Sequence, residues 1–173
     1  ALTASGLLDR SIGGPPIYPP QPAEVTAQVY GGYSYPTSGI PARYRRALYI
    51  HMKRTAPYAA QITFDAPTSE MTCLRRTKSN TPLQALTLLN DAVFTEASEH
   101  LGLRVLKEAT SNDADLIRLL FELVLSRRPT DSEIGRMAAF ISQQMQASRS
   151  IGSKVGQQKY SDTERTWILA ARA

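Results

Sequence analysis

The stretch Lys78–Asp91, KSNTPLQALTLLND, decides the fold. Thr81 is placed to cap a helix, Pro82 suits its first position, and Gln84 completes a T-x-x-Q capping box. An apolar run follows at once, which predicts the start of an amphipathic helix. Because capping and core packing account for these residues, we expect no chemistry from the stretch itself. It separates an irregular N-terminal half from a helical C-terminal half.

The part of the chain after this start, residues 81–173, predicts three to four packed helices. Further T/S-x-x-E boxes occur at Thr130 with Glu133 and at Ser161 with Glu164. The expected spans are Pro82 to about Glu108 with a candidate break at Asn90, Asp113 to Ser126, a helix from Thr130, a polar loop over Gln146–Tyr160, and a last helix from Ser161. The side chains expected to face the core are Leu83, Leu86, Leu88, Leu89, Val93, Ala97 and Leu101, then Leu116, Leu120, Leu123 and Val124, then Ile134, Met137, Ala138, Ile141 and Met145, and finally Trp167 with Ile168.

The N-terminal half is rich in proline, glycine and tyrosine, and we treat the whole chain, 1–173, as a single domain. Residues 1–42 are expected to form an extended arm, because proline lacks a donor and excludes both a helix and a central strand from Gly13 to Pro41. Its tyrosines favour an arm packed on the protein over a flexible linker. Residues 43–80 predict an irregular basic segment with a small β element. The strand-like runs are Arg46–Lys53, Gln61–Phe64 and Met71–Leu74.

The net charge of +5 is concentrated in one segment. Between Arg43 and Lys78 there are eight basic and two acidic residues, whereas the rest of the chain carries a net charge of −1. The single cysteine, Cys73, cannot form an intrachain disulfide, and with only two histidines a structural zinc site is not expected. No apolar run is long enough to span a membrane. The chain begins without Met and stops within an apolar run, so we interpret it as a fragment truncated at both ends.

Three runs of residues carry a family resemblance. They are LLDRSIGGPPIYP from Leu7, RYRRALYIHMKRTAPYAAQITFDAPTSEMTCLRRTKSNTPLQALTLLND from Arg43, and LVLSRRPTDSE from Leu123. In this order they resemble the C-terminal planctomycete-specific, cytochrome-associated domain of unknown function. Ser79 stands where that family more often has Thr, which is a mild change.

The resemblance implies an extracytoplasmic location, periplasmic or at the cell surface, in a large exported protein. It also implies upstream domains of the same polypeptide as partners. No C-x-x-C-H motif occurs, so we expect no cofactor in this segment, and any c-type haem would belong to another part of the full-length protein. The resemblance supplies no reaction.

Two sets of residues are candidates for a site. The basic set could bind an anionic polysaccharide, or could be a solvated face, or could pair with acids of upstream domains; its members are Arg45, Arg46, Arg54, Arg75 and Arg76. Nucleic acid is not expected as a partner, because no recognition motif accompanies the basic residues. Asp65, Glu70 and His51 could form an acid/base set, or could be two turn carboxylates and a structural histidine.

These alternatives lead to one main hypothesis about function. We expect a non-catalytic C-terminal module of an exported, cytochrome-associated bacterial protein, packing against upstream domains. The alternatives are part of a carbohydrate-active enzyme, with Arg54, Asp65 and Arg75 lining its cleft, or a binding module for anionic polysaccharide.

Overall fold

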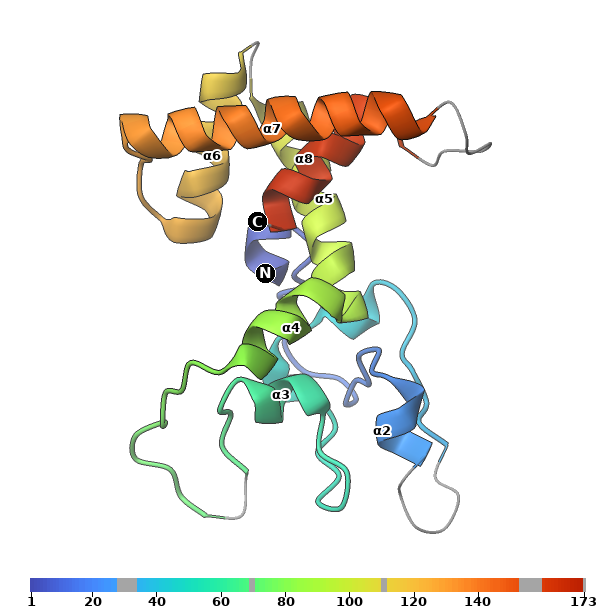
Figure 1. Ribbon diagram of the computed structural model, residues 1–173. Helices are drawn as coiled ribbons and strands as arrows, with labels where there is room; N and C mark the ends of the chain where they lie inside the picture. The colour runs from blue at the N-terminus through green and yellow to red at the C-terminus, as the bar shows by residue number, and fades with distance from the viewer. Residues whose placement is uncertain (28–33, 69–70, 110–111, 153–159, 173) are drawn as a thin grey trace. The chain divides into compact units, whose positions relative to one another are not determined.

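The structure is a computed structural model that describes residues 1–27, 34–68, 71–109, 112–152 and 160–172. These residues contain eight α-helices and two short 3₁₀ helices (Figure 1). Their bounds are α1 Leu2–Ser5, α2 Ala23–Ala27, η1 Ala42–Tyr44, η2 Ala47–Tyr49, α3 Ala59–Thr63, α4 Pro82–Asn90, α5 Ala92–Glu108, α6 Asp113–Leu125, α7 Asp131–Gly152 and α8 Asp162–Arg172. The mainly helical prediction is confirmed, with five helices of seven residues or more where three to four were expected. The additional helix arises because the break at Asn90 separates α4 from α5.

The chain divides into two compact units, and the division falls inside α5. The first unit consists of Ala1–Leu7 together with Glu96–Ala173, and the second is Leu8–Thr95. Each is described by itself below.

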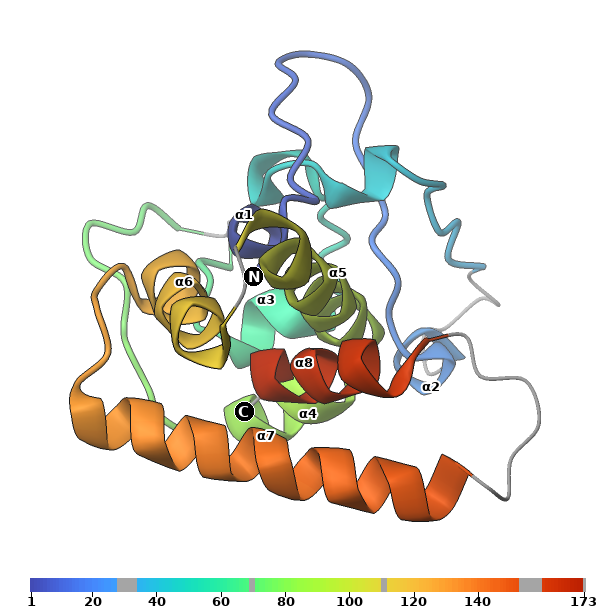
Figure 2. The same cartoon turned by 90° about the horizontal axis from the view of Figure 1, so that it is seen from above.

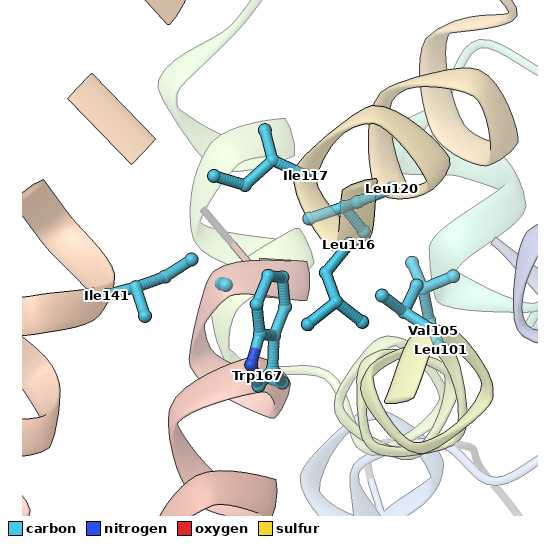
Figure 3. Close-up of a cluster of buried hydrophobic side chains, with 8 residues drawn as sticks. Leu101, Val105, Leu116, Ile117, Leu120, Ile141 and Trp167 are labelled. Carbon is cyan, nitrogen blue, oxygen red and sulfur yellow. The ribbon is translucent and has the colours of Figure 1, made fainter. Parts of the chain in front are cut away.

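The helical unit has an apolar core contributed by four helices. Both α6 and α8 pack against α7, and the two views place α6 beside its first half and α8 beside its second (Figures 1 and 2). Trp167 is 1% exposed and lies between Ile141 and Leu116 in Figure 3. The buried cluster comprises Leu101 and Val105 of α5, Leu116, Ile117 and Leu120 of α6, Ile141 of α7, and Trp167 and Ala170 of α8. The interior positions predicted for Ala97, Leu101, Leu116, Leu120, Ile141, Trp167 and Ile168 are confirmed.

Both later capping boxes form as predicted. Glu133 accepts from the Thr130 N–H at 2.8 Å, and the Glu133 N–H donates to the Thr130 hydroxyl at 3.3 Å. Ser161 and Glu164 repeat this arrangement with the same two distances. Arg127 donates to both Glu133 carboxylate oxygens, at 2.6 and 2.9 Å, and this pairing with the Thr130 contacts lowers the pKa of Glu133 to about 2. The loop expected from Gln146 is wrong up to Gly152, because α7 continues that far, and residues 153–159 of it lie outside the described residues.

The N-terminal unit does not contain the predicted small β element within its described residues. Two isolated parallel bridges, Asp9 with Arg45 and Ile17 with Ile50, are the β pairing found there. At the second bridge the Ile17 N–H donates to the Tyr49 carbonyl at 2.7 Å, and the His51 N–H donates to the Ile17 carbonyl at 2.9 Å. Ile17 stands between the Pro15–Pro16 and Pro19–Pro20 pairs, which lack backbone donors, so the ladder cannot extend.

The three strand-like runs therefore take other conformations. Arg46–Lys53 holds η2, and Gln61–Phe64 belongs largely to α3, where the alanines Ala59 and Ala60 favour a helix. Met71–Leu74 is exposed and irregular, because no neighbouring strand is present to pair with it in the described part of the unit. The pattern of polar and apolar side chains in the sequence could not by itself show that these runs are not strands.

The arm is packed but is not wholly extended. Ile17 is 3% exposed, and the Tyr35 hydroxyl donates to the Pro19 carbonyl at 2.8 Å. The exclusion of helix was wrong at α2, where Pro22 precedes a stretch free of Pro and Gly, and the Val25 N–H donates to the Pro22 carbonyl. Tyr30 and Tyr33, also expected to pack, lie outside the described residues.

Gly102 of α5 lies close to the backbone of α8. A Cβ at Gly102 would lie 2.7 Å from the Ile168 backbone nitrogen, whereas a Cβ at Gly135 of α7 would meet nothing within 4 Å. We predict that Gly102→Ala lowers the free energy of unfolding of the helical unit by about 1–3 kcal/mol through overpacking. The matched Gly135→Ala control should instead raise it by about 0.5–1 kcal/mol, since alanine is the better helix former. Urea denaturation followed by Trp167 fluorescence measures both; equal effects would contradict the close approach.

Candidate functional site

A hollow of the N-terminal unit lies between α3 and the segment that joins α3 to α4. Its volume is about 710 Å³, within the range of ligand sites. It brings together four of the charged candidates, Arg54, Asp65, Arg75 and Arg76, including the three that were expected to line a cleft. We call it the arginine hollow. Its large aliphatic lining residues are Met52, Ile62, Met71 and Leu74.

The three arginines of the hollow are not equivalent. Arg76 donates to the Phe64 carbonyl at 3.0 Å and to the Asp65 carbonyl at 3.3 Å, so it caps the C-terminal end of α3. Arg54 and Arg75 are exposed and form no ion pair or hydrogen bond within the described part of the chain. The hollow therefore presents two guanidinium groups whose donors are open to a ligand.

The Asp65 carboxylate accepts hydrogen bonds that hold the wall of the hollow in place. One carboxylate oxygen accepts from the Ser79 N–H at 2.8 Å, from the Ser79 hydroxyl at 2.7 Å and from the Gln84 amide at 3.4 Å. These hydrogen bonds, those from Ser79 first, lower the pKa of Asp65 below its ordinary value. The carboxylate therefore stays ionised at neutral pH, which suits an anchor and not a general acid.

Gln84 also holds the connecting segment where it meets the ends of α3 and α4. Its amide nitrogen also donates to the Thr63 carbonyl at 2.9 Å and to the Ser79 hydroxyl at 3.0 Å, while its oxygen accepts from the Thr81 N–H at 3.3 Å. The capping box predicted from sequence is confirmed. The additional bonds to Thr63, Asp65 and Ser79 have no local sequence signal, because the partners lie up to 21 residues away.

The predicted acid/base set is not assembled in the described residues. His51 lies against the Tyr18 ring, with 4.8 Å between ring centroids, and is not among the residues lining the arginine hollow. Glu70 lies outside the described residues. Asp65 is thus the one carboxylate of the described lining, and its acceptors already receive three hydrogen bonds.

Arg45 lies away from the hollow and clamps the arm. It is 7% exposed, and its guanidinium donates to the carbonyls of Gly13, of Pro15 at 3.1 Å and of Ser11 at 3.4 Å. Its guanidinium carbon also lies 3.7 Å from the centroid of the Tyr49 ring. The Tyr49 hydroxyl in turn accepts from the Gly13 N–H at 2.9 Å.

Arg45 is therefore occupied by the protein itself, and the resemblance motifs around Leu7 and Arg43 are joined through it. The neighbouring Arg46 is exposed, at 5.8 Å from the Tyr49 ring, and does not line the hollow. The basic candidates thus separate into a buried clamp, an exposed neighbour and the hollow's three arginines.

The described part of the chain offers no candidate metal centre. Its His, Cys, Asp and Glu residues form no group able to hold a metal ion. Cys73 is a free, exposed thiol on the lining of the hollow. None of the helices in that part is both long enough and apolar enough to cross a membrane.

The described residues are thus mainly helical, and the arginine hollow of the N-terminal unit combines cationic and aliphatic side chains. The chain belongs to the PSD1 family, described as a protein of unknown function (DUF1553), whose family model matches residues 1–141. Searches of curated proteins and of solved structures find no significant match. Family membership agrees with the resemblance seen in the motifs; the planctomycete and cytochrome associations stay predictions.

The Arg45 clamp can be tested by a substitution that keeps its charge. Lysine cannot reach several carbonyls at once, so we predict that Arg45→Lys lowers the free energy of unfolding of the N-terminal unit by about 2 kcal/mol. Arg46→Lys is the matched control and should change it by less than about 0.5 kcal/mol. Thermal unfolding followed by tyrosine near-ultraviolet circular dichroism measures both. Equal stability of the two variants would show that the carbonyl contacts contribute nothing.

The Asp65 anchor can be tested through the segment that it closes. We predict that Asp65→Asn, which retains a residue tolerant of the left-handed φ of 56°, speeds tryptic cleavage after Arg75 and Lys78 by roughly 3- to 10-fold at neutral pH. Asp131→Asn, at the start of α7, should leave these rates unchanged.

The anchor should also depend on pH. Because the folded pKa of Asp65 lies below its ordinary value, the anchor is present above about pH 4 and is lost as the pH falls through the lowered pKa. The Ser79 amide chemical shift in NMR spectra should follow this titration. A shift that titrates unchanged in Asp65→Asn would contradict the assignment.

Proposed function

We propose that this domain is a non-catalytic packing module of a larger exported, cytochrome-associated bacterial protein, and that another domain of the same polypeptide covers its N-terminal unit. The observation that carries the proposal is the exposure of large aliphatic side chains between α3 and the end of α4. They are Ile62, Met71, Leu74, Leu83, Leu86, Leu88 and Leu89, exposed by 47% or more. The family resemblance supports upstream domains as the source of the cover.

The leucines of α4 are not buried in the described unit. Leu83, Leu86, Leu88 and Leu89 were expected to face a core, yet α4 has no buried residue. Leu83 and Leu86 line a second, shallower hollow of about 320 Å³ against α3, to which Ala59 and Ala60 also contribute. Short α3 thus has a hollow on each of two faces, and both are partly aliphatic.

The N-terminal unit buries too few of its described side chains to form an apolar core that includes these leucines. Among the described residues its buried hydrophobic side chains are Ile17, Tyr44 and Tyr58, whereas the described residues of the helical unit include ten. Aliphatic surface gains about 25 cal/mol for each Å² removed from water, so a covering domain would stabilise the unit. Concentrated exposed aliphatic surface is typical of a protein–protein contact.

The carbohydrate alternatives have less support from the same surface. The lining of the arginine hollow holds one carboxylate among its described residues, whereas glycoside hydrolysis usually needs two. No aromatic ring belongs to that described lining on which a sugar could stack. Aliphatic side chains, by contrast, gain most from a dry protein contact.

The proposal predicts that two leucines of α4 matter in the full-length polypeptide and not in the isolated domain. Leu83→Ser/Leu86→Ser should change the free energy of unfolding of the isolated domain by about 0.5 kcal/mol or less. In the full-length polypeptide the same pair should cost about 2–4 kcal/mol, because the leucines become buried there. Denaturant unfolding of the two proteins measures the difference.

The matched control is Val124→Ser/Leu125→Ser in α6, whose side chains are exposed to a similar extent, 50% and 52%. This pair should have the same small effect in both proteins. If Leu83→Ser/Leu86→Ser costs as much in the isolated domain as in the full-length polypeptide, the leucines pack internally and the proposal is wrong.

A further inference from the structure

The arginine hollow carries charge that an aliphatic cover alone would leave unpaired. Its described lining has three guanidinium groups and one carboxylate. The Asp65 carboxylate is already occupied by Ser79 and Gln84, and Arg76 is bonded to backbone carbonyls. Arg54 and Arg75 are left without a partner in the described part of the chain.

Covering these two arginines changes their electrostatic situation. A guanidinium group that loses its water without gaining an anion is strongly disfavoured, so the covering surface must supply negative charge. Carboxylates fit best, because the planar guanidinium fork pairs with the two carboxylate oxygens at once. The same surface must also be aliphatic, since it meets Met71 and Leu74, which are 82% and 98% exposed.

The hollow is held ready before any partner arrives. Arg76 ties its wall to the end of α3, and the bonds from Ser79 and Gln84 to Asp65 close the segment at its base. Figure 1 shows this segment extending away from α3 and α4 on either side of its grey portion. Where these bonds hold the wall, less entropy is lost on binding, which favours a specific contact.

We propose that the arginine hollow receives Asp or Glu side chains, flanked by aliphatic residues, from the domain that covers the N-terminal unit. The inference rests on the proposed function and adds the chemistry of the partner surface. Arg54 and Arg75 bind the carboxylates, and Ile62, Met71 and Leu74 contact the aliphatic neighbours. A nucleic acid or an anionic polysaccharide would satisfy the charge but would leave the aliphatic side chains against polar groups.

The test places an amine where each open arginine stands. Arg54→Lys and Arg75→Lys keep the positive charge and provide an amine that a carbodiimide joins directly to a neighbouring carboxylate. In the full-length polypeptide, each variant should give a zero-length cross-link from position 54 or 75 to an Asp or Glu outside residues 1–173, identified by mass spectrometry. Arg136→Lys, on the exposed surface of α7, is the matched control and should give none.

A second measurement uses the unmodified arginines. Phenylglyoxal should modify Arg54 and Arg75 about tenfold more slowly in the full-length polypeptide than in the isolated domain, since paired guanidinium groups lose their access. Arg136 should react at the same rate in both.

Arg54→Gln/Arg75→Gln should speed oxidation of Met71 in the full-length polypeptide several-fold, whereas Arg136→Gln should not.

The outcomes separate this inference from the proposed function. If the leucine pair of α4 matters in the full-length polypeptide but positions 54 and 75 give no cross-link and stay fully reactive, the acidic partner is wrong and the packing module stands. If neither effect is found, both fail. Protection of Arg54 and Arg75 that appears only after adding heparin or vesicles containing phosphatidylglycerol would overturn the inference in favour of a polysaccharide or a membrane surface.

Discussion

The hydrogen bonds of the Gln84 side chain are the interactions on which the region around α3 and α4 depends. Its oxygen closes the capping box at the start of α4, and its amide nitrogen bonds to Thr63, Asp65 and Ser79. One side chain therefore starts a helix, ends another and closes the segment between them. Because buried or shared donors of this kind have fixed geometry, the hollow beside α3 has a defined wall even though the segment contains no regular structure.

A second constraint comes from the prolines of the arm. They remove the donors that a sheet would need, so the arm is held by single contacts instead of a ladder. Arg45 supplies several of these contacts, because its guanidinium donates to the carbonyls of Ser11, Gly13 and Pro15. The unit is thus organised by polar clamps around a small apolar interior, whereas the helical unit is organised by side-chain packing around Trp167. This contrast explains why the aliphatic surface left exposed is concentrated in the N-terminal unit.

Much of the helical unit could be predicted from sequence, since its signals are local. Capping boxes lie within four residues, and the apolar stripes of α6 and α7 follow the period of a helix. The candidate site was predicted in part: Arg54, Asp65 and Arg75 do come together. Arg45 could not be assigned correctly from the sequence. Its charge made it a candidate ligand-binding residue, but it is buried and bonds to the arm of the same chain. The strand predictions were wrong for a related reason. Alternating polar and apolar side chains indicate which residues share a face, but they do not show that a partner strand is present.

The sequence by itself determined the family, the helical character and most ends of the five longer helices, because each of these depends on residues that are neighbours along the chain. Only the tertiary structure decided which apolar residues are buried and which arginines are open. The leucines of α4 and α5 have the same character in sequence, yet Leu101 is 5% exposed and Leu86 is 56% exposed. Burial is a property of the surfaces that meet a side chain, and those surfaces come from residues far away in the chain.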